Sequence, residues 1–454
     1  MSTRVLCAST LYGAVTLAAA LDSGCFAAAD RTVLVVCTTA AIPETAVPLD
    51  RMPGFERLRD RFDRVVSWNE AIAPFHPSGW SPRADDAPLW ERYLRMLWEL
   101  GDEPVELALE SLQVPPALSL ARLFPDAPID VYADGLMSYG PTRSKLDPLV
   151  GERVRRLLHL DLVPGLRPLL LAEFSTVPEV IPTAAFTAVV ASLAEGRPES
   201  AAEAAEPGGG ALLLGQYLSA LAILTPDEEE ELHLSMVRGA VAEGHTRLLF
   251  KPHPVAPASW THALEQEAAA LGAELTVIDR PELAEVLLLR LRPALVVACF
   301  STGLFTAAHF YGVPVARVGT GLLLERLTPY ENSNRVPVTL ADALLPDLAA
   351  GGRSGPPYAA GDPLGPAGGN LPGLVAAVGY AMQPKIRPDL RTAAERFLGA
   401  HLDETVRRYF KRRRLTALGL PGGLPAPRRA VVRRLARRPA VRRVALRVRR
   451  AAGR

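Results

Sequence analysis

Three short stretches of the chain place polar residues directly after runs of strand-forming residues. In the first, Tyr132-Ala133-Asp134-Gly135, a carboxylate and a glycine follow an apolar run that ends at residue 132. A carboxylate in this place can act as a general base, and a glycine allows a sharp turn. A helix N-cap or a turn is the alternative role for Asp134. Tyr139 and Arg143 follow, and they could contact a substrate or merely cover the loop.

The second stretch is Lys251-Pro252-His253-Pro254. The two prolines restrict the backbone around His253, whose cationic imidazole can bind or protonate a phosphate leaving group. Lys251 adds positive charge, and we expect Lys251 and Pro254 to line the same nucleotide site. A turn that only ends the strand is the alternative, and the second His-Pro pair at residues 76–77 shows that the dipeptide alone has little specificity.

The third stretch, Ser301-Thr302-Gly303, occupies a strand-to-helix turn. Hydroxyl groups and backbone N–H groups at a helix N-terminus bind anions, and an N-cap role is compatible with that function. Gly215 and Gln216 follow the strand predicted at residues 211–214, where a glycine lets a nucleotide approach the backbone closely.

Glu282 and Glu285 lie between the second and third stretches, at the start of a predicted helix. A carboxylate in this position can accept hydrogen bonds from both ribose hydroxyls of a nucleotide. Each glutamate taken singly can equally be a solvated helix residue.

The elements that must position these residues show a regular alternation of strand-like runs and helical patterns, which is typical of parallel α/β sheets. Strand-like runs occur at residues 5–7, 33–36, 65–66, 129–132 and 168–171, and the alternation resumes between residues 211 and 318. The predicted fold class is therefore α/β, with two Rossmann-like doubly wound domains. Ligands of such sheets bind at the carboxyl ends of the strands, where all three stretches lie.

Composition shifts divide the chain further. Residues 195–210 are rich in Ala, Glu, Pro and Gly, as is typical of a linker. The predicted division is an N-terminal Rossmann-like domain (1–195), a linker (196–210), a C-terminal Rossmann-like domain (211–348), a mobile Gly/Pro-rich loop (349–370), C-terminal helices (371–414) and a basic tail (415–454).

The N-terminus resembles a signal peptide only in part. Residues 14–20 are largely apolar, but Arg4 is the only basic residue before them. Residues 3–8, 14–21 and 32–36 favour a strand, a helix and a strand, so we predict the start of a doubly wound domain instead. No run of 18 or more apolar residues occurs, and no transmembrane helix is predicted.

The four cysteines, Cys7, Cys25, Cys37 and Cys299, form no close pair with metal-ligand spacing. Three of them lie in apolar, strand-like runs. Buried reduced thiols are therefore expected, which suits a cytoplasmic protein.

The three stretches, in this order, resemble the motif set of bacterial sialyltransferases, and most of all the alpha-2,8-polysialyltransferase family. The resemblance spans roughly residues 3 to 345. The motifs that carry it are Val131-Tyr132-Ala133-Asp134-Gly135, Phe250-Lys251-Pro252-His253-Pro254, Cys299-Phe300-Ser301-Thr302-Gly303 and Asn332-Ser333-Asn334-Arg335.

This resemblance implies a GT-B fold with a central cleft between an N-terminal acceptor domain (1–195) and a C-terminal nucleotide-sugar domain (211–348). It also implies CMP-sialic acid as the donor, a glycan acceptor, inversion at the anomeric carbon, and no metal or other cofactor. It implies that Asp134 deprotonates the acceptor hydroxyl and that His253 binds or protonates the departing phosphate. Ser301 and Thr302 would hold that phosphate. Glu285, or Glu282, would hold the ribose. The family's acidic pair is reduced here to Ala133-Asp134, which favours Asp134 as the base.

Other functions fit the same residues. A CDP-glycerol-type phosphotransferase or a UDP-sugar 2-epimerase would keep the fold and change the reaction. A non-catalytic nucleotide- or glycan-binding protein would keep the cleft alone, consistent with the missing acid at Ala133.

The basic tail needs its own explanation. Residues 401–454 contain 18 Lys and Arg against 2 Asp and Glu, so the other 400 residues carry a net charge of −15 within a chain of net charge +1. Arginine pairs alternate with Val and Leu after residue 428, which predicts a cationic amphipathic segment that binds an anionic membrane surface. Nucleic acid is the rival partner, and a solvated tail is the plain alternative. Together these features predict a cytoplasmic enzyme at the inner face of the plasma membrane.

Overall fold

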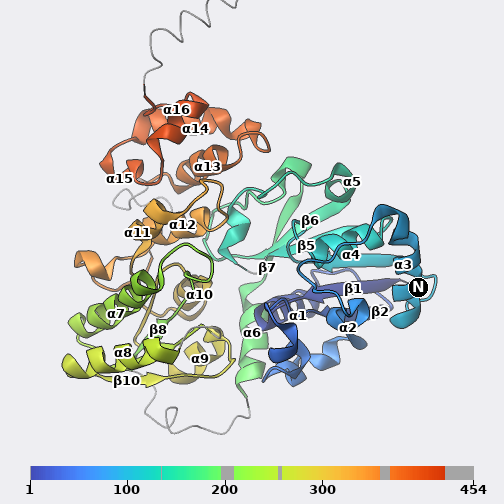
Figure 1. Cartoon of the computed structure of the whole chain (residues 1–454), viewed down its shortest axis with the longest axis horizontal. Helices are drawn as coiled ribbons and strands as arrows, with labels where there is room; N and C mark the ends of the chain where they lie inside the picture. Colours follow the sequence, from blue (N-terminus) through green and yellow to red (C-terminus); the bar gives the residue numbers. More distant parts are fainter. Residues whose placement is uncertain (1, 134, 196–208, 254–257, 358–368, 425–454) are drawn as a thin grey trace, which may run out of the picture.

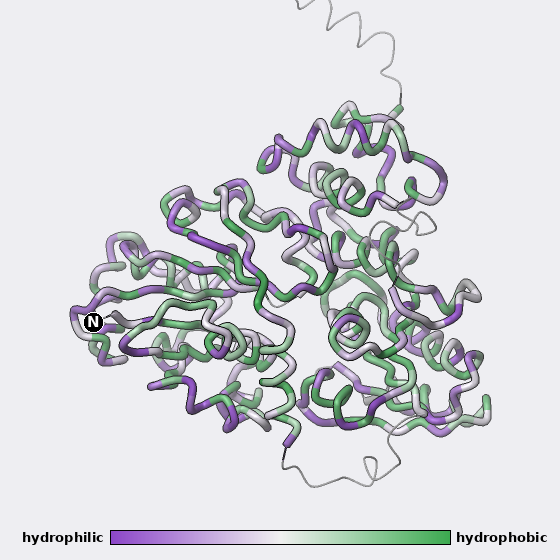
Figure 2. Tube along the Cα trace, turned by 180° about the vertical axis from the view of Figure 1, so that it is seen from behind, coloured by the Kyte–Doolittle hydropathy of each residue, from purple (hydrophilic) through white to green (hydrophobic). Residues whose placement is uncertain are grey.

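The computed structural model describes residues 2–133, 135–195, 209–253, 258–357 and 369–424. These residues form two Rossmann-like domains, each built on a parallel sheet, and a group of C-terminal helices (Figure 1). Hydrophobic residues lie mostly inside each domain and hydrophilic residues mostly on the outer helices and loops (Figure 2).

The N-terminal domain has a seven-stranded sheet in the order β3-β2-β1-β4-β5-β6-β7, with every neighbouring pair parallel. Its strands are β1 (Thr3–Ala8), β2 (Arg31–Val36), β3 (Arg64–Ser67), β4 (Val105–Leu109), β5 (Ile129–Ala133), β6 (Val154–Leu160) and β7 (Val177–Ile181). Its helices are α1 (Leu11–Asp22), α2 (Trp68–Ile72), α3 (Ala87–Leu97), α4 (Ala117–Leu123), α5 (Pro148–Gly151) and α6 (Thr183–Ala194), with the 3₁₀ helix η6 (Leu136–Tyr139) after β5.

The C-terminal domain has a five-stranded parallel sheet in the order β10-β9-β8-β11-β12. Its strands are β8 (Ala211–Leu214), β9 (Arg247–Lys251), β10 (Glu274–Val277), β11 (Leu295–Ala298) and β12 (Val315–Arg317). Its helices are α7 (Pro226–Ala242), α8 (Ala258–Ala270), α9 (Ala284–Leu291), α10 (Thr302–Tyr311), α11 (Thr320–Arg326) and α12 (Arg335–Leu344). The helices α13 (Leu371–Met382), α14 (Arg391–His401), α15 (Glu404–Arg407) and α16 (Arg412–Leu418) complete the described chain.

Both sheets reverse their strand order beside their first strand, which is the switch point of a doubly wound fold. The predicted α/β class with two Rossmann-like domains is therefore confirmed. The β1-α1-β2 start is confirmed as well, and all of β1 is buried. Cys7, Cys37 and Cys299 are free and buried, as expected.

The strand predicted at residues 168–171 is wrong. Pro168 has no N–H group for a ladder, and Leu171 has a φ of 59°, which lies outside the strand region. The neighbouring strands β6 and β7, which the sequence pattern did not indicate, flank this segment instead. In β6, two arginines interrupt the apolar run, and the buried carboxylate of Asp130 pairs with both, at 2.9 Å (Arg155) and 3.0 Å (Arg156).

Within the region of C-terminal helices predicted at residues 371–414, residues 389–410 do not form one continuous helix. α14 ends at His401, and a new helix begins after Asp403, whose side chain accepts a hydrogen bond from the Val406 N–H. This N-cap supplies an alternative partner for the backbone and so ends the continuous helix.

α6 lies between the two sheets and holds the domains together (Figure 1). Its Phe186 packs on Tyr12 of α1, with ring centroids 5.4 Å apart, and on Phe310 of α10, at 5.7 Å. Aromatic contacts on both sides of one helix fix the relative position of the two domains.

The C-terminal helices are tied to the second domain by the buried carboxylate of Asp342 in α12. It pairs with Arg317 of β12 at 3.3 Å, with Arg408 at 2.5 Å, and it accepts a hydrogen bond from Thr320 at 2.7 Å. Three separate segments therefore depend on one buried charge.

We predict that Asp342→Ala destabilises the protein by about 3 kcal/mol, because it removes the buried carboxylate that pairs with both Arg317 and Arg408, while Arg317 keeps its ion pair with Asp347 at 2.7 Å. Calorimetric unfolding would show this as a lower transition temperature. The matched control is Asp86→Ala, which removes the surface ion pair with Arg83 and should change the transition little. Equal shifts for the two variants would contradict the prediction.

Candidate active site

Three of the predicted segments meet at the carboxyl edge of the C-terminal sheet. They follow β8, β9 and β11, which are neighbours in that sheet. The Gly215 N–H donates to the Lys251 carbonyl at 2.9 Å, and the Gln216 Oε1 accepts a hydrogen bond from the Phe300 N–H at 3.1 Å. These bonds hold the three strand ends in one group.

Glycines allow this close packing. A Cβ atom at Gly215 would lie 2.9 Å from the Phe250 ring, and one at Gly303 would lie 2.8 Å from Leu214. Both distances are shorter than normal carbon contacts, so these two positions exclude side chains.

Ser301 and Thr302 begin α10. The Ser301 hydroxyl caps the helix by accepting a hydrogen bond from the Gly303 N–H at 3.2 Å. The positive end of the helix therefore lies at the carboxyl edge of the sheet, where it favours an anion. Ser301 therefore does have the alternative role of an N-cap, and this role is compatible with an anion at the N-terminus of α10.

The turn after β5 touches this same helix terminus. A Cβ atom built on Gly135 would lie 3.1 Å from the Thr302 hydroxyl oxygen. The first and third predicted segments, 167 residues apart in the chain, are therefore in contact across the two domains. Asp134 itself and Pro254 lie outside the described residues, while their neighbours Ala133, Gly135 and His253 are described.

Lys251 and His253 supply the positive charge. Burial lowers the pKa of Lys251, although the carboxylates of Glu282 and Glu285 oppose this shift. The Lys251 ammonium also donates a hydrogen bond to the Arg280 carbonyl, at 3.4 Å. Burial, and secondly the charge of Lys251, lowers the pKa of His253, with Glu229 acting in the opposite direction. The His253 ring lies 6.1 Å from the ring of Tyr217.

Glu282 and Glu285 are both buried at the start of α9. Glu282 forms an ion pair with Arg290 at 2.8 Å. Glu285 accepts a hydrogen bond from the Thr306 hydroxyl at 2.8 Å, and burial raises the pKa of its carboxyl group. The two carboxyl groups thus already have protein neighbours within the C-terminal domain.

Tyr139 and Arg143 lie in different surroundings. Tyr139 is fully buried, and its hydroxyl oxygen accepts a hydrogen bond from the Val163 N–H at 3.0 Å. This placement favours loop packing over substrate contact. Arg143 is exposed, and its backbone bridges Gln113 and Gln383 at 2.6 Å and 2.5 Å.

Asp161 is a further candidate that the sequence pattern did not indicate. It follows β6, the strand next to β5, and the register pairs Ala133 with His159. The Asp161 charge opposes the lowering of the pKa of His159 and of His309, which burial causes. A carboxylate and two imidazoles from both domains therefore lie close to the end of β5. The sequence signal for Asp161 would have been an apolar strand directly before it. Arg155 and Arg156 interrupt that apolar run in β6.

The described residues contain neither a metal-ligand cluster nor a membrane-spanning helix. No group of three or more His, Cys, Asp or Glu side chains there could hold a metal ion. Within the same part of the chain, no helix is long and apolar enough to cross a membrane.

Comparison with protein families gives one match over residues 4–320, described as "Alpha-2,8-polysialyltransferase (POLYST)". No curated protein sequence matches the chain.

Several solved glycosyltransferase structures are similar to the chain at low identity. The GT-B domain of a sialyltransferase from Photobacterium damselae is 12% identical, with 74% of this chain and 95% of that chain covered and a TM-score of 0.39. Acinetobacter baumannii MurG is also 12% identical, with 89% and 97% covered and a TM-score of 0.37. An O-GlcNAc transferase from Thermobaculum terrenum is 13% identical, with 91% and 68% covered and a TM-score of 0.35.

We predict that His253 titrates below the ordinary histidine pKa of about 6.5, because it is partly buried beside Lys251. Lys251→Met should raise this pKa by removing the neighbouring positive charge, yet leave it below the ordinary value because burial is the larger cause. NMR titration of the His253 ring measures both values. Lys385→Met, at an exposed lysine after α13, is the matched control. A fall in the pKa of His253 in Lys251→Met would be incompatible with this electrostatic account.

Proposed function

The chain belongs to the alpha-2,8-polysialyltransferase family and is a GT-B glycosyltransferase, and we propose that it transfers sialic acid from CMP-sialic acid to a glycan acceptor by inverting, metal-independent substitution. Building or capping a surface glycan is the corresponding role. The observation that carries the proposal is the contact between Gly135 and Thr302, because it unites the segment of the proposed base with the helix terminus of the proposed phosphate site.

The reaction is a single displacement at the anomeric carbon. Asp134 accepts the proton of the acceptor hydroxyl, and the acceptor oxygen forms a bond to that carbon as the bond to the CMP phosphate oxygen breaks. One displacement inverts the configuration. The departing phosphate takes the bonding electron pair, and its charge must be stabilised in the transition state.

Lys251, His253 and the N-terminus of α10 supply that stabilisation in the proposal. All three lie at the carboxyl edge of one sheet, and together they place positive charge beside the phosphate. A protonated His253 can neutralise the phosphate or donate a proton to it. The nucleotide would lie against Gly215 and Gln216, with its ribose toward α9.

Asp161 is our candidate for the acidic function that Ala133 lacks. Asp161 directly follows β6, the strand next to β5, and no described residue forms a hydrogen bond with its carboxylate. It could accept the proton in place of Asp134, or stabilise a neighbouring imidazolium.

The alternatives differ in the products they form. A CDP-glycerol-type phosphotransferase would release CMP from CDP-glycerol, and a UDP-sugar 2-epimerase would require no acceptor. A binding protein would hold CMP tightly without turnover. The positive charge of Lys251 beside His253 supports a nucleotide phosphate in each case, so turnover decides among them.

We predict that the protein releases CMP from CMP-sialic acid and that His253→Ala lowers the rate by about 10²–10⁴-fold. Asp134→Asn should lower the rate by a similar factor, and Asp161→Asn by a similar factor only if Asp161 is the second acid. Chromatographic detection of CMP gives the rate for each variant.

His262→Ala is the matched control, since His262 lies on α8 with an exposed side chain, and its rate should equal that of the unaltered protein. Tight binding of CMP without any release from CMP-sialic acid would instead favour the binding protein. Unchanged turnover in both His253→Ala and Asp134→Asn would sink the proposed mechanism.

The proposed location is the cytoplasmic face of an anionic membrane, with the tail as the contact. The tail predicted at residues 415–454 overlaps described structure at its start, because Leu415 and Leu420 are buried in the core. A deletion that tests the tail must therefore begin at residue 425, where the described residues end.

We predict that deletion of residues 425–454 releases the protein from anionic liposomes and spares CMP release, because it removes basic residues and leaves the core intact. Co-sedimentation with phosphatidylserine vesicles measures the binding, and neutral phosphatidylcholine vesicles are the control. Binding to anionic vesicles that is unchanged by the deletion would exclude the tail as the anchor. Preferential binding to RNA over vesicles would favour the nucleic-acid alternative.

A further inference from the structure

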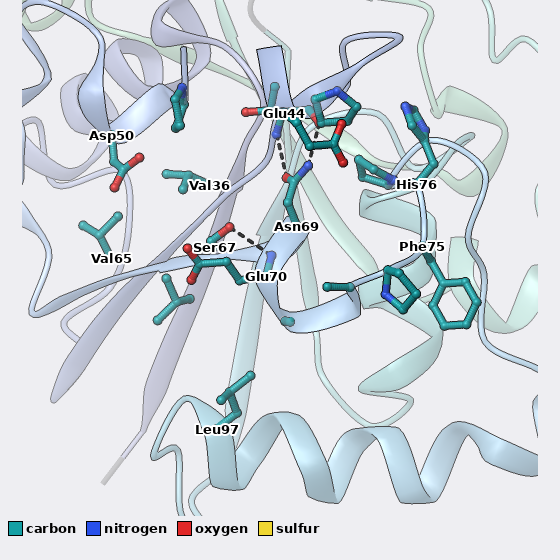
Figure 3. A pocket seen from close by; sticks show the side chains of 18 of the residues that line it. Val36, Glu44, Asp50, Val65, Ser67, Asn69, Glu70, Phe75, His76 and Leu97 are labelled. Carbon is teal, nitrogen blue, oxygen red and sulfur yellow. Dashed lines mark hydrogen bonds between the residues drawn. The ribbon is translucent and has the colours of Figure 1, made fainter. Parts of the chain in front are cut away.

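A cavity of about 960 Å³ lies in the N-terminal domain, over the carboxyl ends of β2 and β3 (Figure 3). Its walls come from the segment after β2, from β3 and α2, and from the end of α3. The proposed catalytic groups play no part in it. In Figure 3, Asp50 and Glu70 lie beside Val65 at one end, and Phe75 and His76 lie at the other.

The cavity and the candidate active site share one edge of the seven-stranded sheet. β2 and β5 are three strands apart in that sheet, a separation of about 14 Å at the usual strand spacing. A chain molecule can therefore reach from the cavity to the end of β5 along a single edge, whereas a single sugar cannot occupy both places.

The wall of the cavity is held in place before any ligand binds. Asn69 forms two hydrogen bonds of 2.9 Å with the backbone N–H and carbonyl of Thr38. His76 bonds the Ala40 carbonyl at 2.9 Å and accepts from the Ser78 N–H at 3.2 Å. These bonds fix the segment after β2 against α2, which favours binding with little reorganisation.

Three carboxylates in the wall remain available to a ligand. The side chains of Glu44, Asp50 and Glu70 form no hydrogen bond or ion pair with other described residues, and Figure 3 shows all three around the cavity. Each carboxylate can accept hydrogen bonds from ligand hydroxyl groups. The backbone N–H of Glu70 is already used by Ser67, so the carboxylate is the free part of this residue.

Aromatic rings supply the complementary apolar surface. The side chains of Phe75 and Tyr93 are 51% and 38% exposed although both line the cavity. Exposed rings beside hydrogen-bond acceptors suit a ligand with apolar C–H faces and hydroxyl edges, as in a sugar ring.

The charged side chains that line the cavity favour a neutral sugar over an anionic one. Arg64 is already paired with Glu99 at 3.0 Å, so Arg51 is the one lining arginine without an ion-pair partner among the described residues. Three carboxylates against one arginine repel an anionic sugar. The carboxylates are also not gathered as metal ligands, since no described cluster of three acidic, His or Cys side chains could hold an ion.

We propose that this cavity binds a neutral, hydroxyl-rich oligosaccharide segment of the acceptor, at a distance from the bond that is formed. The proposal rests on the glycosyltransferase function and deepens it. The cavity holds the uncharged part of the acceptor, while the end that receives the sugar extends along the sheet edge toward β5. It is therefore a positioning site, and the residues named here take no part in the chemical step.

The test is direct binding, which needs no turnover. Saturation-transfer NMR with the full-length protein would use neutral maltotetraose and lacto-N-tetraose, and trisialic acid as the anionic probe. We expect the neutral oligosaccharides to bind and trisialic acid to bind more weakly at this cavity. Phe75→Ala and Glu70→Gln should each weaken the neutral oligosaccharides by about five- to tenfold.

Matched controls lie on the same domain away from the cavity. Leu149→Ala removes an exposed apolar side chain of α5, and Glu152→Gln neutralises an exposed carboxylate beside it, and neither should change oligosaccharide binding. The thermal shift produced by CMP should be equal in all variants, which shows that the second domain is intact.

The possible outcomes separate the two proposals. If both cavity variants bind the neutral oligosaccharides as well as the unaltered protein does, or if none of them binds at millimolar concentration, the cavity is not an oligosaccharide site. Tighter binding of trisialic acid that Phe75→Ala abolishes would overturn the neutral class. Loss of CMP release with oligosaccharide binding intact would count against the glycosyltransferase mechanism alone.

Discussion

The contact between the turn after β5 and the N-terminus of α10 is the constraint on which the proposed site depends. The carboxyl ends of parallel strands lie at one edge of the sheet, so in each domain the candidate site residues that follow the strands lie at that edge. One site can include residues of both domains only if these two sheet edges lie close together. Because Gly135 has no side chain, the turn after β5 can lie against Thr302. The aromatic packing of Phe186 on Tyr12 and Phe310 keeps the domains in that position.

Within the C-terminal domain, buried surroundings and neighbouring charges set the pKa values of Lys251 and His253. Burial disfavours the charged forms of Lys251 and His253, while the carboxylates near them favour charge. The net effect lowers the pKa of His253, and an anion bound beside the ring would favour its protonated form. A nucleotide phosphate between His253 and the α10 terminus would meet positive charge that the fold has already oriented, which is the condition for electrostatic stabilisation of a leaving group.

The sequence predicts those parts of the fold whose pattern is local. Clear local signals mark the apolar run Val5–Ala8 in β1, the fully apolar β8, and the capped start of α7 with Thr225, Pro226 and Glu228. β6 was missed because the carboxylate that neutralises its arginines comes from β5, and β7 was missed because Pro178 is tolerated only at the edge of the sheet. The contact of Gly135 with Thr302 joins distant segments, and no local pattern can indicate it.

The cavity over β2 and β3 has no local sequence signal, in contrast to the motifs that directly follow strands. The lining of the cavity comes from loops, strands and helices that are separate in the sequence, and the His-Pro pair at residues 76–77 gives no signal that the pair containing His253 lacks. Its charge also fits the rest of the molecule. Apart from its final 54 residues the chain carries a net charge of −15, so the proposed anionic donor would be attracted only where Lys251, His253 and the N-terminus of α10 supply local positive charge. On the rest of the protein outside the basic tail, the net negative charge would not repel an uncharged acceptor segment. In the proposal, the distribution of charge thus separates an anionic donor, at the carboxyl edge of the C-terminal sheet, from a neutral acceptor segment, at the cavity over β2 and β3.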